Sequence, residues 1–286
     1  MLPASYYWPI QDPYHPLNYS WNGCSEIASK GKNTTLIFSF NNELPRNSTL
    51  TIVGPSLPFS ASDGTIIRNY LENNGTVLLA DDTGSGNSLL EELNVSVRFA
   101  GDALADLYPY DRNPSFPLVT HFSPGPLSNN VSIVILNHPS FLRILDSSGV
   151  MVLASSSPFS FVDMSGNGKP APNESVNSYP IIAYTHIGNG SLILASNAGM
   201  FTNEMIDLHD NMRLFENVAR DRGSLLVDVA HLANAPLTKL HLAVKNDIDW
   251  FAQSSLYIQA ILVILILAAA LPIRSLRGRG KVTVRF

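Results

Sequence analysis

Two adjacent acidic residues, Asp81 and Asp82, end an apolar run and precede a small-residue stretch at 83–86. Paired carboxylates can bind a divalent cation, and a glycine-rich turn that opens a helix can receive an anion. The acids argue against an anion, and the two glycines at 84 and 86 lack the third glycine of a dinucleotide fingerprint. This turn is therefore where we expect chemistry, if there is any, and the alternative is that Asp82 only caps or turns the loop.

Other reactive residue types lack the context that catalysis needs. The single cysteine, Cys24, has no strand-to-helix elbow around it, so we interpret it as a structural thiol. Ser56 and Ser140 lack the G-x-S-x-G pattern of a nucleophilic serine. The seven histidines include no pair with metal-ligand spacing on one helix. We expect no catalytic residue and no cofactor.

The acidic turn closes a β-α-β unit. Apolar runs at 51–53 and 77–80 predict two buried strands, and Ser60 with Asp63 predicts the start of a helix between them. Residues 73–75 (NNG) end that helix. Two buried strands joined by one helix imply a parallel sheet with a right-handed crossover, with a further helix at 88–93.

Open α/β sheets bind ligands at the carboxyl ends of their strands. The polar residues expected there form a weak candidate ligand site, whose members are Ser56, Asp81, Asp82, Asn137, His138, Asn197 and Asn203. The alternative interpretation is that these side chains only fix turns and strand-to-helix connections. Farther along, residues 188–190 (GNG) between apolar runs predict a hairpin, and residues 203–220 predict an amphipathic helix.

The carboxy-terminal segment predicts a membrane anchor. Residues 250–273 carry no charge, and 260–271 are apolar throughout, which favours a transmembrane helix at 254–273 over a buried core helix. A juxtamembrane helix at 236–253 precedes it, and a basic tail at 274–286 follows. Basic segments that flank a membrane helix stay on the cytoplasmic side of the membrane. We therefore expect the tail in the cytoplasm and the domain that precedes the helix outside the cell. A tail-anchored protein with a cytoplasmic domain is the alternative.

Charge and sequons agree with an extracytoplasmic domain at 21–235. The net charge is −5, and without the basic tail the remainder is more acidic still, which excludes nucleic acid as a partner. Residues 1–20 form an irregular segment without an export signal, so we expect an upstream signal or first membrane helix to be missing, or the start to be placed too late. Eight sequons predict a glycoprotein. Their acceptors are Asn18, Asn33, Asn47, Asn74, Asn94, Asn130, Asn173 and Asn189.

Several segments carry a resemblance to a known family. Residues 51–56 (TIVGPS), 71–82 (LENNGTVLLADD), 187–197 (IGNGSLILASN), 201–206 (FTNEMI) and 210–217 (DNMRLFEN) resemble the uncharacterised DUF4350 family. The resemblance implies a fold similar to class I glutamine amidotransferase-like domains and to the domain shared by gliding-motility and intraflagellar-transport proteins. It also implies a prokaryotic, archaeal setting, a membrane helix on each side, and genes beside MoxR-type ATPases.

Together these observations predict an α/β domain with a mainly parallel, flavodoxin-like or amidotransferase-like sheet, helices on both faces and one transmembrane helix. The expected function is a membrane-anchored, extracytoplasmic, non-catalytic module that is an interaction or structural subunit of a cell-envelope complex. Its expected partners are the lipid bilayer and membrane or envelope proteins. The alternative is a receptor for a sugar or a divalent cation, or a hydrolase, that uses Asp81 and Asp82.

Overall fold

The computed structural model describes residues 9–31, 33–41, 43–172, 174–219, 223–253 and 256–270. The described residues divide into two units, one of residues 9–238 and one that begins at residue 239. The predicted basic tail at 274–286 and the sequon asparagine Asn173 lie outside the described residues.

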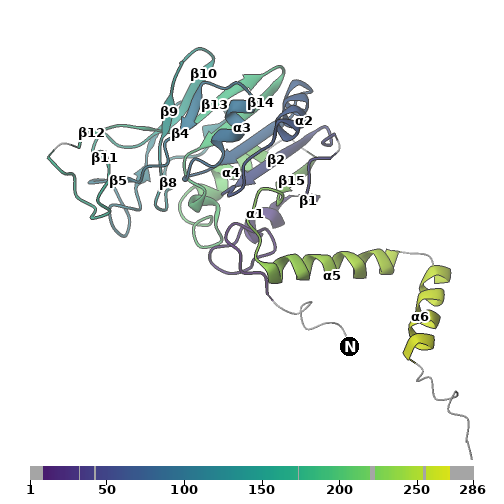
Figure 1. Ribbon diagram of the computed structural model, residues 1–286. Helices are drawn as coiled ribbons and strands as arrows, with labels where there is room; N and C mark the ends of the chain where they lie inside the picture. The colour runs from purple at the N-terminus through teal and green to yellow at the C-terminus, as the bar shows by residue number, and fades with distance from the viewer. Residues whose placement is uncertain are drawn as a thin grey trace, which may run out of the picture. The chain divides into compact units, whose positions relative to one another are not determined.

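An eight-stranded sheet forms the centre of the first unit, in the order β1-β15-β2-β3-β14-β13-β10-β7 (Figure 1). Its strands are β1 (Thr34–Ile37), β2 (Ser48–Val53), β3 (Thr76–Ala80), β7 (His121–Phe122), β10 (Val150–Ser155), β13 (Pro180–Ile187), β14 (Gly190–Ala195) and β15 (Ser224–Asp228). β15, one of the last elements of the unit, pairs between β1 and β2.

The pairing of neighbouring strands changes from parallel to antiparallel halfway across the sheet. β1, β15, β2, β3 and β14 run parallel, whereas β14, β13, β10 and β7 alternate in direction. In all, the described residues contain four parallel and seven antiparallel strand pairings. The predicted mainly parallel, flavodoxin-like sheet is therefore wrong. The reason is local: the predicted hairpin at 188–190 is confirmed, and a tight turn can join only antiparallel strands.

The predicted β-α-β unit is confirmed in β2, α2 (Ala61–Glu72) and β3. Ser60 caps α2 by accepting a hydrogen bond from the backbone N–H of Asp63, and the Asp63 carboxylate accepts one from the Ser60 N–H. The second predicted helix is α3 (Asn87–Glu92). The helix predicted at 203–220 begins later, as α4 (Asn211–Ala219), because residues 203–210 form turns and a 3-10 helix, η3 (Gly199–Phe201), precedes them.

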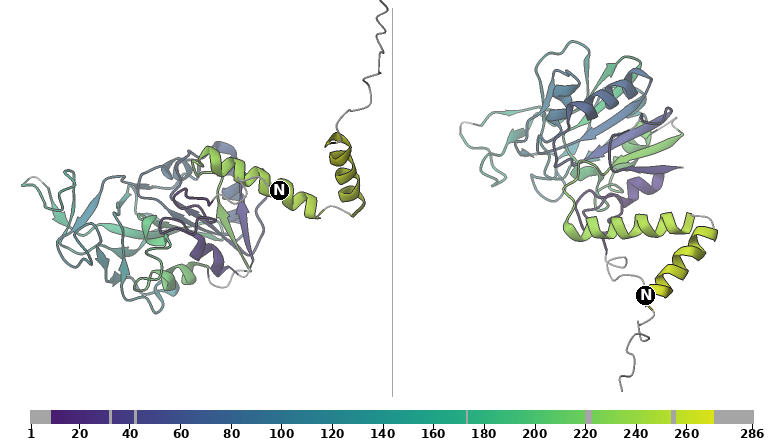
Figure 2. Two further views of the ribbon diagram at one scale, coloured as in Figure 1. Left: turned by 90° about the horizontal axis from the view of Figure 1, so that it is seen from below. Right: turned by 45° about the vertical axis from the view of Figure 1, so that its right-hand side comes forward.

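Helices cover both faces of the sheet, as the alternation of buried residues along β3 requires (Figure 2). Val77 and Leu79 pack in one core with residues of α2 and α3. Leu78 and Ala80 point into the other core, with residues of α1 (Ser25–Lys30) and α4.

Three small antiparallel sheets extend the unit beyond the main sheet. One pairs β12 (Val176–Asn177), β11 (Ser160–Val162) and β5 (Leu104–Asp106), and Figures 1 and 2 show it at the end of the domain far from β1. The others pair β4 (Val97–Phe99) with β9 (Leu142–Ile144), and β6 (Leu118–Val119) with β8 (Val134–Ile135). A 3-10 helix, η2 (Pro126–Ser128), lies beside α4.

The carboxy-terminal elements are two helices, α5 (Pro236–Gln253) and α6 (Leu256–Ala270). Among the described residues, no helix combines the length and the apolar composition needed to cross a bilayer. The apolar helix α6 has 15 residues, whereas a spanning helix needs about 20. The predicted transmembrane helix, and the single-pass membrane localisation based on it, are therefore wrong. The predicted contacts with a lipid bilayer and with membrane or envelope proteins stay predictions.

Candidate functional site

The carboxyl ends of the five parallel strands meet at one edge of the sheet, as the sequence predicts for β2 and β3. This edge collects Asp81 and Asp82 after β3 and Asn197 after β14. Asn137 lies at this edge too, because it makes two hydrogen bonds with Asn197. The Asn137 N–H donates to Asn197 Oδ1 at 2.9 Å, and Asn197 Nδ2 donates to the Asn137 carbonyl at 2.8 Å. Four of the seven predicted site residues therefore lie together.

Asp81 is buried, and its carboxylate is engaged by its own loop. Oδ1 accepts hydrogen bonds from the N–H and the hydroxyl of Thr83, each at 2.8 Å, and Oδ2 accepts one from the N–H of Gly86 at 2.7 Å. These bonds fix the turn into α3, so Asp81 has the capping role that the sequence suggested as the alternative for Asp82. Among the described residues no group of three His, Cys, Asp or Glu side chains is placed to hold a metal ion.

Asp82 is half-buried and lies in a different environment. Burial, followed by the charge of Asp81, raises its pKa to about 6, although the backbone N–H groups of Ala198 and Gly199 favour the charged carboxylate. Asn197 Nδ2 approaches Asp82 Oδ2 at 3.4 Å. The Asp82 carboxylate therefore takes up a proton closer to neutral pH than an ordinary aspartate does.

Tyr14 forms part of the surroundings of Asp82. Burial, followed by the charge of Asp82, raises the pKa of the Tyr14 phenol well above its usual value. The ring packs over Gly54, where an added Cβ would lie 2.1 Å from Tyr14 Cδ2. Both residues have a positive φ, 59° for Tyr14 and 58° for Gly54. The close packing therefore depends on a glycine at the end of β2.

The three remaining candidates make contacts with other parts of the chain. Ser56 accepts a hydrogen bond from the N–H of Ala233 at 2.7 Å, which ties the end of β2 to the loop after β15. His138 has a φ of 47° and lies edge-on to Phe116. Asn203 donates to the carbonyls of Asn18 and Ser20 and so fastens the amino-terminal loop. A position after a predicted strand was therefore not enough to predict which of the seven residues lie together.

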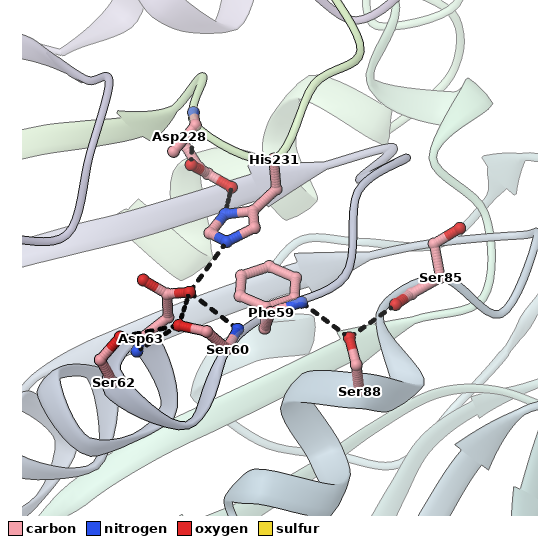
Figure 3. Close-up of polar contacts among 9 residues, drawn as sticks. Phe59, Ser60, Ser62, Asp63, Ser85, Ser88, Asp228 and His231 are labelled. Atoms are coloured by element: carbon pink, nitrogen blue, oxygen red, sulfur yellow. Dashed lines mark hydrogen bonds and ion pairs between the residues drawn. The ribbon is translucent and has the colours of Figure 1, made fainter.

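A second polar cluster at this edge was not predicted. Figure 3 shows His231 between two acids, with Nδ1 2.8 Å from Asp228 Oδ2 and Nε2 3.6 Å from Asp63 Oδ2. The imidazole stacks on the Phe59 ring, with centroids 3.6 Å apart. The Asp63 carboxylate also accepts hydrogen bonds from the N–H and hydroxyl of Ser60. The only local signal was the Asp228-x-x-His231 spacing after an apolar run.

The charges of this cluster fit a structural role, in which the three side chains hold two elements together. Burial raises the pKa of Asp228 despite its hydrogen bond to His231. Burial by itself lowers the pKa of His231, but the hydrogen bond and charge of Asp228, followed by the charge of Asp63, outweigh it and raise the pKa. The imidazole faces the Asp63 carboxylate, and the Ser60 hydroxyl donates to that same carboxylate instead of to the imidazole. The cluster joins the end of β15 to the start of α2.

The thiol and the sequon residues occupy varied environments. Cys24 is buried, burial raises its pKa, and its thiol donates to the Phe201 carbonyl at 3.4 Å, as expected of a structural thiol. Asn18 is fully buried, and its Nδ2 donates to the Asp12 carbonyl and to Asn22 Oδ1, bonds that a glycan would break. The exposed acceptors are Asn33, Asn47, Asn74, Asn94, Asn130 and Asn189. Glycosylation at these six stays a prediction.

The small sheet of β5, β11 and β12 carries exposed apolar side chains. Leu107, Tyr108 and Phe159, here called the distal apolar group, are 41%, 70% and 51% exposed. They lie where β5 and β11 meet, because the Leu107 N–H donates to the Phe159 carbonyl at 3.1 Å. The fully buried Asp106 fixes this corner by accepting bonds from the Tyr108 N–H and the hydroxyls of Ser157 and Ser160.

Comparison with known proteins gives a family and distant structural likenesses. The family described as Domain of unknown function (DUF4350) matches residues 16–219. No curated protein matches the chain. The N-terminal domain of mmIFT52 is 19% identical, with a TM-score of 0.46, over 60% of this chain and 77% of that one. The β-galactosidase of Bacillus circulans sp. alkalophilus is 10% identical, with a TM-score of 0.36, over 59% of this chain and 22% of that one. The exo-β-1,4-mannosidase Op5Man5 of the Opitutaceae bacterium strain TAV5 is 9% identical, with a TM-score of 0.36, over 62% and 26%.

Proposed function

Because the chain belongs to the DUF4350 family, whose description assigns no activity, we propose a function from its own geometry. The chain is a non-catalytic α/β module that binds another protein through the distal apolar group and so serves as an interaction or structural subunit of a larger assembly. The observation that carries this proposal is the exposure of Leu107, Tyr108 and Phe159 together on a rigid corner.

The rigidity of this corner favours binding. Asp106 accepts three hydrogen bonds from within the corner, and Ser157 donates to the Tyr108 carbonyl at 2.8 Å. A surface that is already ordered loses little conformational entropy when a partner binds. Tyrosine is enriched among the residues that dominate interface energies, and large aromatic groups contribute most when a partner removes them from water.

The arrangement at the carboxyl edge supports a non-catalytic role. The Asp81 carboxylate is engaged by a backbone group of its own loop, and the Asn197 amide and the Ser56 hydroxyl are engaged by backbone groups of neighbouring loops. His231, which has the side-chain type for general base catalysis, lies between two carboxylates instead of facing a hydroxyl. These side chains stabilise connections between strands and helices.

Replacing both aromatic residues of the distal apolar group tests the proposal. Tagged wild type and the Tyr108→Ser/Phe159→Ser variant are used to capture proteins from the source cells, and proteins lost with the variant are then purified. Because each buried aromatic contributes about 1–2 kcal/mol or more at an interface, we expect the purified partner to bind the variant at least about 30-fold more weakly. Calorimetry with the purified components gives the two dissociation constants.

The matched control is Leu145→Ser, which removes an exposed leucine from the turn between β9 and β10. We expect this variant to bind like wild type, and all three proteins to unfold at similar urea concentrations. Equal affinity of the purified partner for wild type and the double variant would refute the distal apolar group as the interface. Turnover of a substrate that one substitution at the carboxyl edge abolishes would refute the non-catalytic role.

A second candidate function rests on Asp82. Its raised pKa and its place among Asn197 and the N–H groups of Ala198 and Gly199 suit a small ligand recognised by hydrogen bonds. A hydrolase that acts on glycosides needs two working carboxylates. Of the pair Asp81 and Asp82, Asp81 is held by hydrogen bonds to its own loop, so the pair offers one such carboxylate, Asp82. A receptor for a small polar ligand such as a sugar is therefore the form of this alternative that we propose.

A further inference from the structure

A cavity of about 800 Å³ opens on the face of the sheet that packs against α4. The strand register defines its floor. Thr76, Ser191 and His186 lie opposite one another on β3, β14 and β13, and the next row consists of Ile193, Tyr184 and Met151. The first row is polar and the second mainly apolar, so the floor has two chemically distinct bands.

The walls of the cavity are held by hydrogen bonds. On one side, the Ser123 N–H donates to the Leu153 carbonyl at 2.7 Å, and its hydroxyl donates to the Val152 carbonyl at 2.8 Å. On the other side, Asn217 of α4 donates to the carbonyls of Leu127 and Asn129. These bonds fix residues 123–129 relative to β10 and α4, so the cavity is preformed.

The lining carries polar groups but no charge. It contains no Lys, Arg, Asp or Glu, and its polar side chains are hydroxyls, one amide and one imidazole. His186 Nδ1 lies 3.0 Å from the Gly190 carbonyl oxygen, which can only accept, so Nδ1 is the donor and Nε2 of the neutral ring is an acceptor. Asn217 Oδ1 is buried without a hydrogen-bond partner among the described residues.

The lining selects the chemistry of the ligand. A charged ligand would lose its hydration without meeting an opposite charge, which costs several kcal/mol. A purely apolar ligand would cover the hydroxyls of Thr76, Ser191 and Tyr184 without offering hydrogen bonds. A neutral carbohydrate offers hydroxyls that both donate and accept, together with a C–H face that packs on an aromatic ring. The volume lies within the range of about 300–1,000 Å³ that small-molecule sites occupy.

We propose that this cavity binds a short neutral carbohydrate, with the sugar hydroxyls toward Thr76, Ser191 and His186 and the sugar C–H face toward Tyr184. The site is separate from both the distal apolar group and Asp82. It therefore does not depend on the proposed function, and the two can fail independently.

The test uses the full chain on an array of neutral and acidic oligosaccharides, followed by calorimetry with the best neutral probe. The blocking variant is Gly125→Phe, because Gly125 lines the cavity, has extended backbone at φ 173°, and has open space around an added Cβ. We expect at least a tenfold loss of affinity in this variant. Tyr184→Phe keeps the ring and removes the hydroxyl, and we expect a loss of a few fold to tenfold.

Two control variants distinguish binding in this cavity from a general effect of added bulk and from binding at Asp82. Thr65→Phe adds the same bulk to an exposed position on α2, whose side chains pack on the opposite face of the sheet. Asp82→Asn alters the carboxyl edge. Both variants are expected to bind the sugar like wild type, and the methyl resonance of Met151 is expected to shift on titration. Binding to no neutral glycan on the array, equal binding to Gly125→Phe, or loss of binding in Asp82→Asn would each overturn the proposal.

Discussion

Replacing His231 with phenylalanine is expected to lower the free energy of unfolding by about 3–5 kcal/mol near pH 6. The new ring can keep the stacking on Phe59, but the buried Asp228 loses the imidazole that lies 2.8 Å from its Oδ2. A buried carboxylate left without its partner is among the costliest single changes in a folded protein. Urea unfolding of wild type and variant, followed by circular dichroism, measures the difference.

A double-mutant cycle separates the pair from simple packing. Asp228→Asn keeps the shape of the side chain and its ability to accept from the Ala230 N–H. We expect Asp228→Asn/His231→Phe to be more stable than His231→Phe alone, because the double variant buries no uncompensated charge. If the second substitution instead adds its own full cost, the two side chains do not act as a pair.

The pH dependence gives an independent measure of the same cluster. A histidine whose pKa is raised by folding binds its proton more tightly in the folded state, so its stabilisation is complete below its ordinary pKa of about 6.5. The stabilisation is lost as the pH rises from 6.5 through the raised value. Wild type should therefore lose stability over this window more steeply than Asp228→Asn/His231→Phe, in which neither side chain titrates. Parallel curves for the two proteins would contradict the raised pKa.

The local parts of the fold could be predicted from the sequence. Ser60 and Asp63 are three residues apart, so their capping box depends on short-range geometry alone. The hairpin at 188–190 is equally local. The mainly parallel sheet could not be excluded, because the order of strands depends on long-range pairing. In particular, no local pattern places β15 between β1 and β2.

In the candidate site, too, the sequence predicted the features that depend on neighbouring residues and missed those that depend on long-range pairing. Asp81 and Asp82 adjoin a predicted strand end, so the sequence located both. The roles of the two acids differ for reasons that adjacency does not reveal: Asp81 turns toward Thr83 and Gly86, whereas Asp82 meets residues after β14. The His231 cluster joins residues 63, 228 and 231, which meet only because β15 pairs in parallel with β2. Apolar composition was likewise insufficient, because within the described residues it accompanies a helix, α6, of only 15 residues.

Replacing Asp82 with asparagine is expected to stabilise the domain by about 1–3 kcal/mol at pH 7.5 and to have no such effect at pH 4. The pKa of Asp82 rises from 3.8 to about 6 on folding, so the folded state holds the proton more tightly. In wild type, Asp82 therefore costs no stability below its ordinary pKa of 3.8. The free energy of unfolding falls as the pH rises from there through about 6. Asparagine carries no charge to lose hydration, and solvent screening at this half-buried site favours the lower end of the range.

Urea unfolding at the two pH values, with Asp207→Asn as an exposed control, measures this gain. A stabilisation that is equal at both pH values would show that charge is not its cause. A carboxylate that costs stability at neutral pH is typical of positions that serve a function, because activity and stability often conflict there. If Asp82→Asn gains stability and a small polar ligand no longer raises its melting temperature as it does that of wild type, Asp82 holds that ligand. If no such ligand stabilises either protein, Asp82 belongs to the scaffold, and the distal apolar group remains the basis of function.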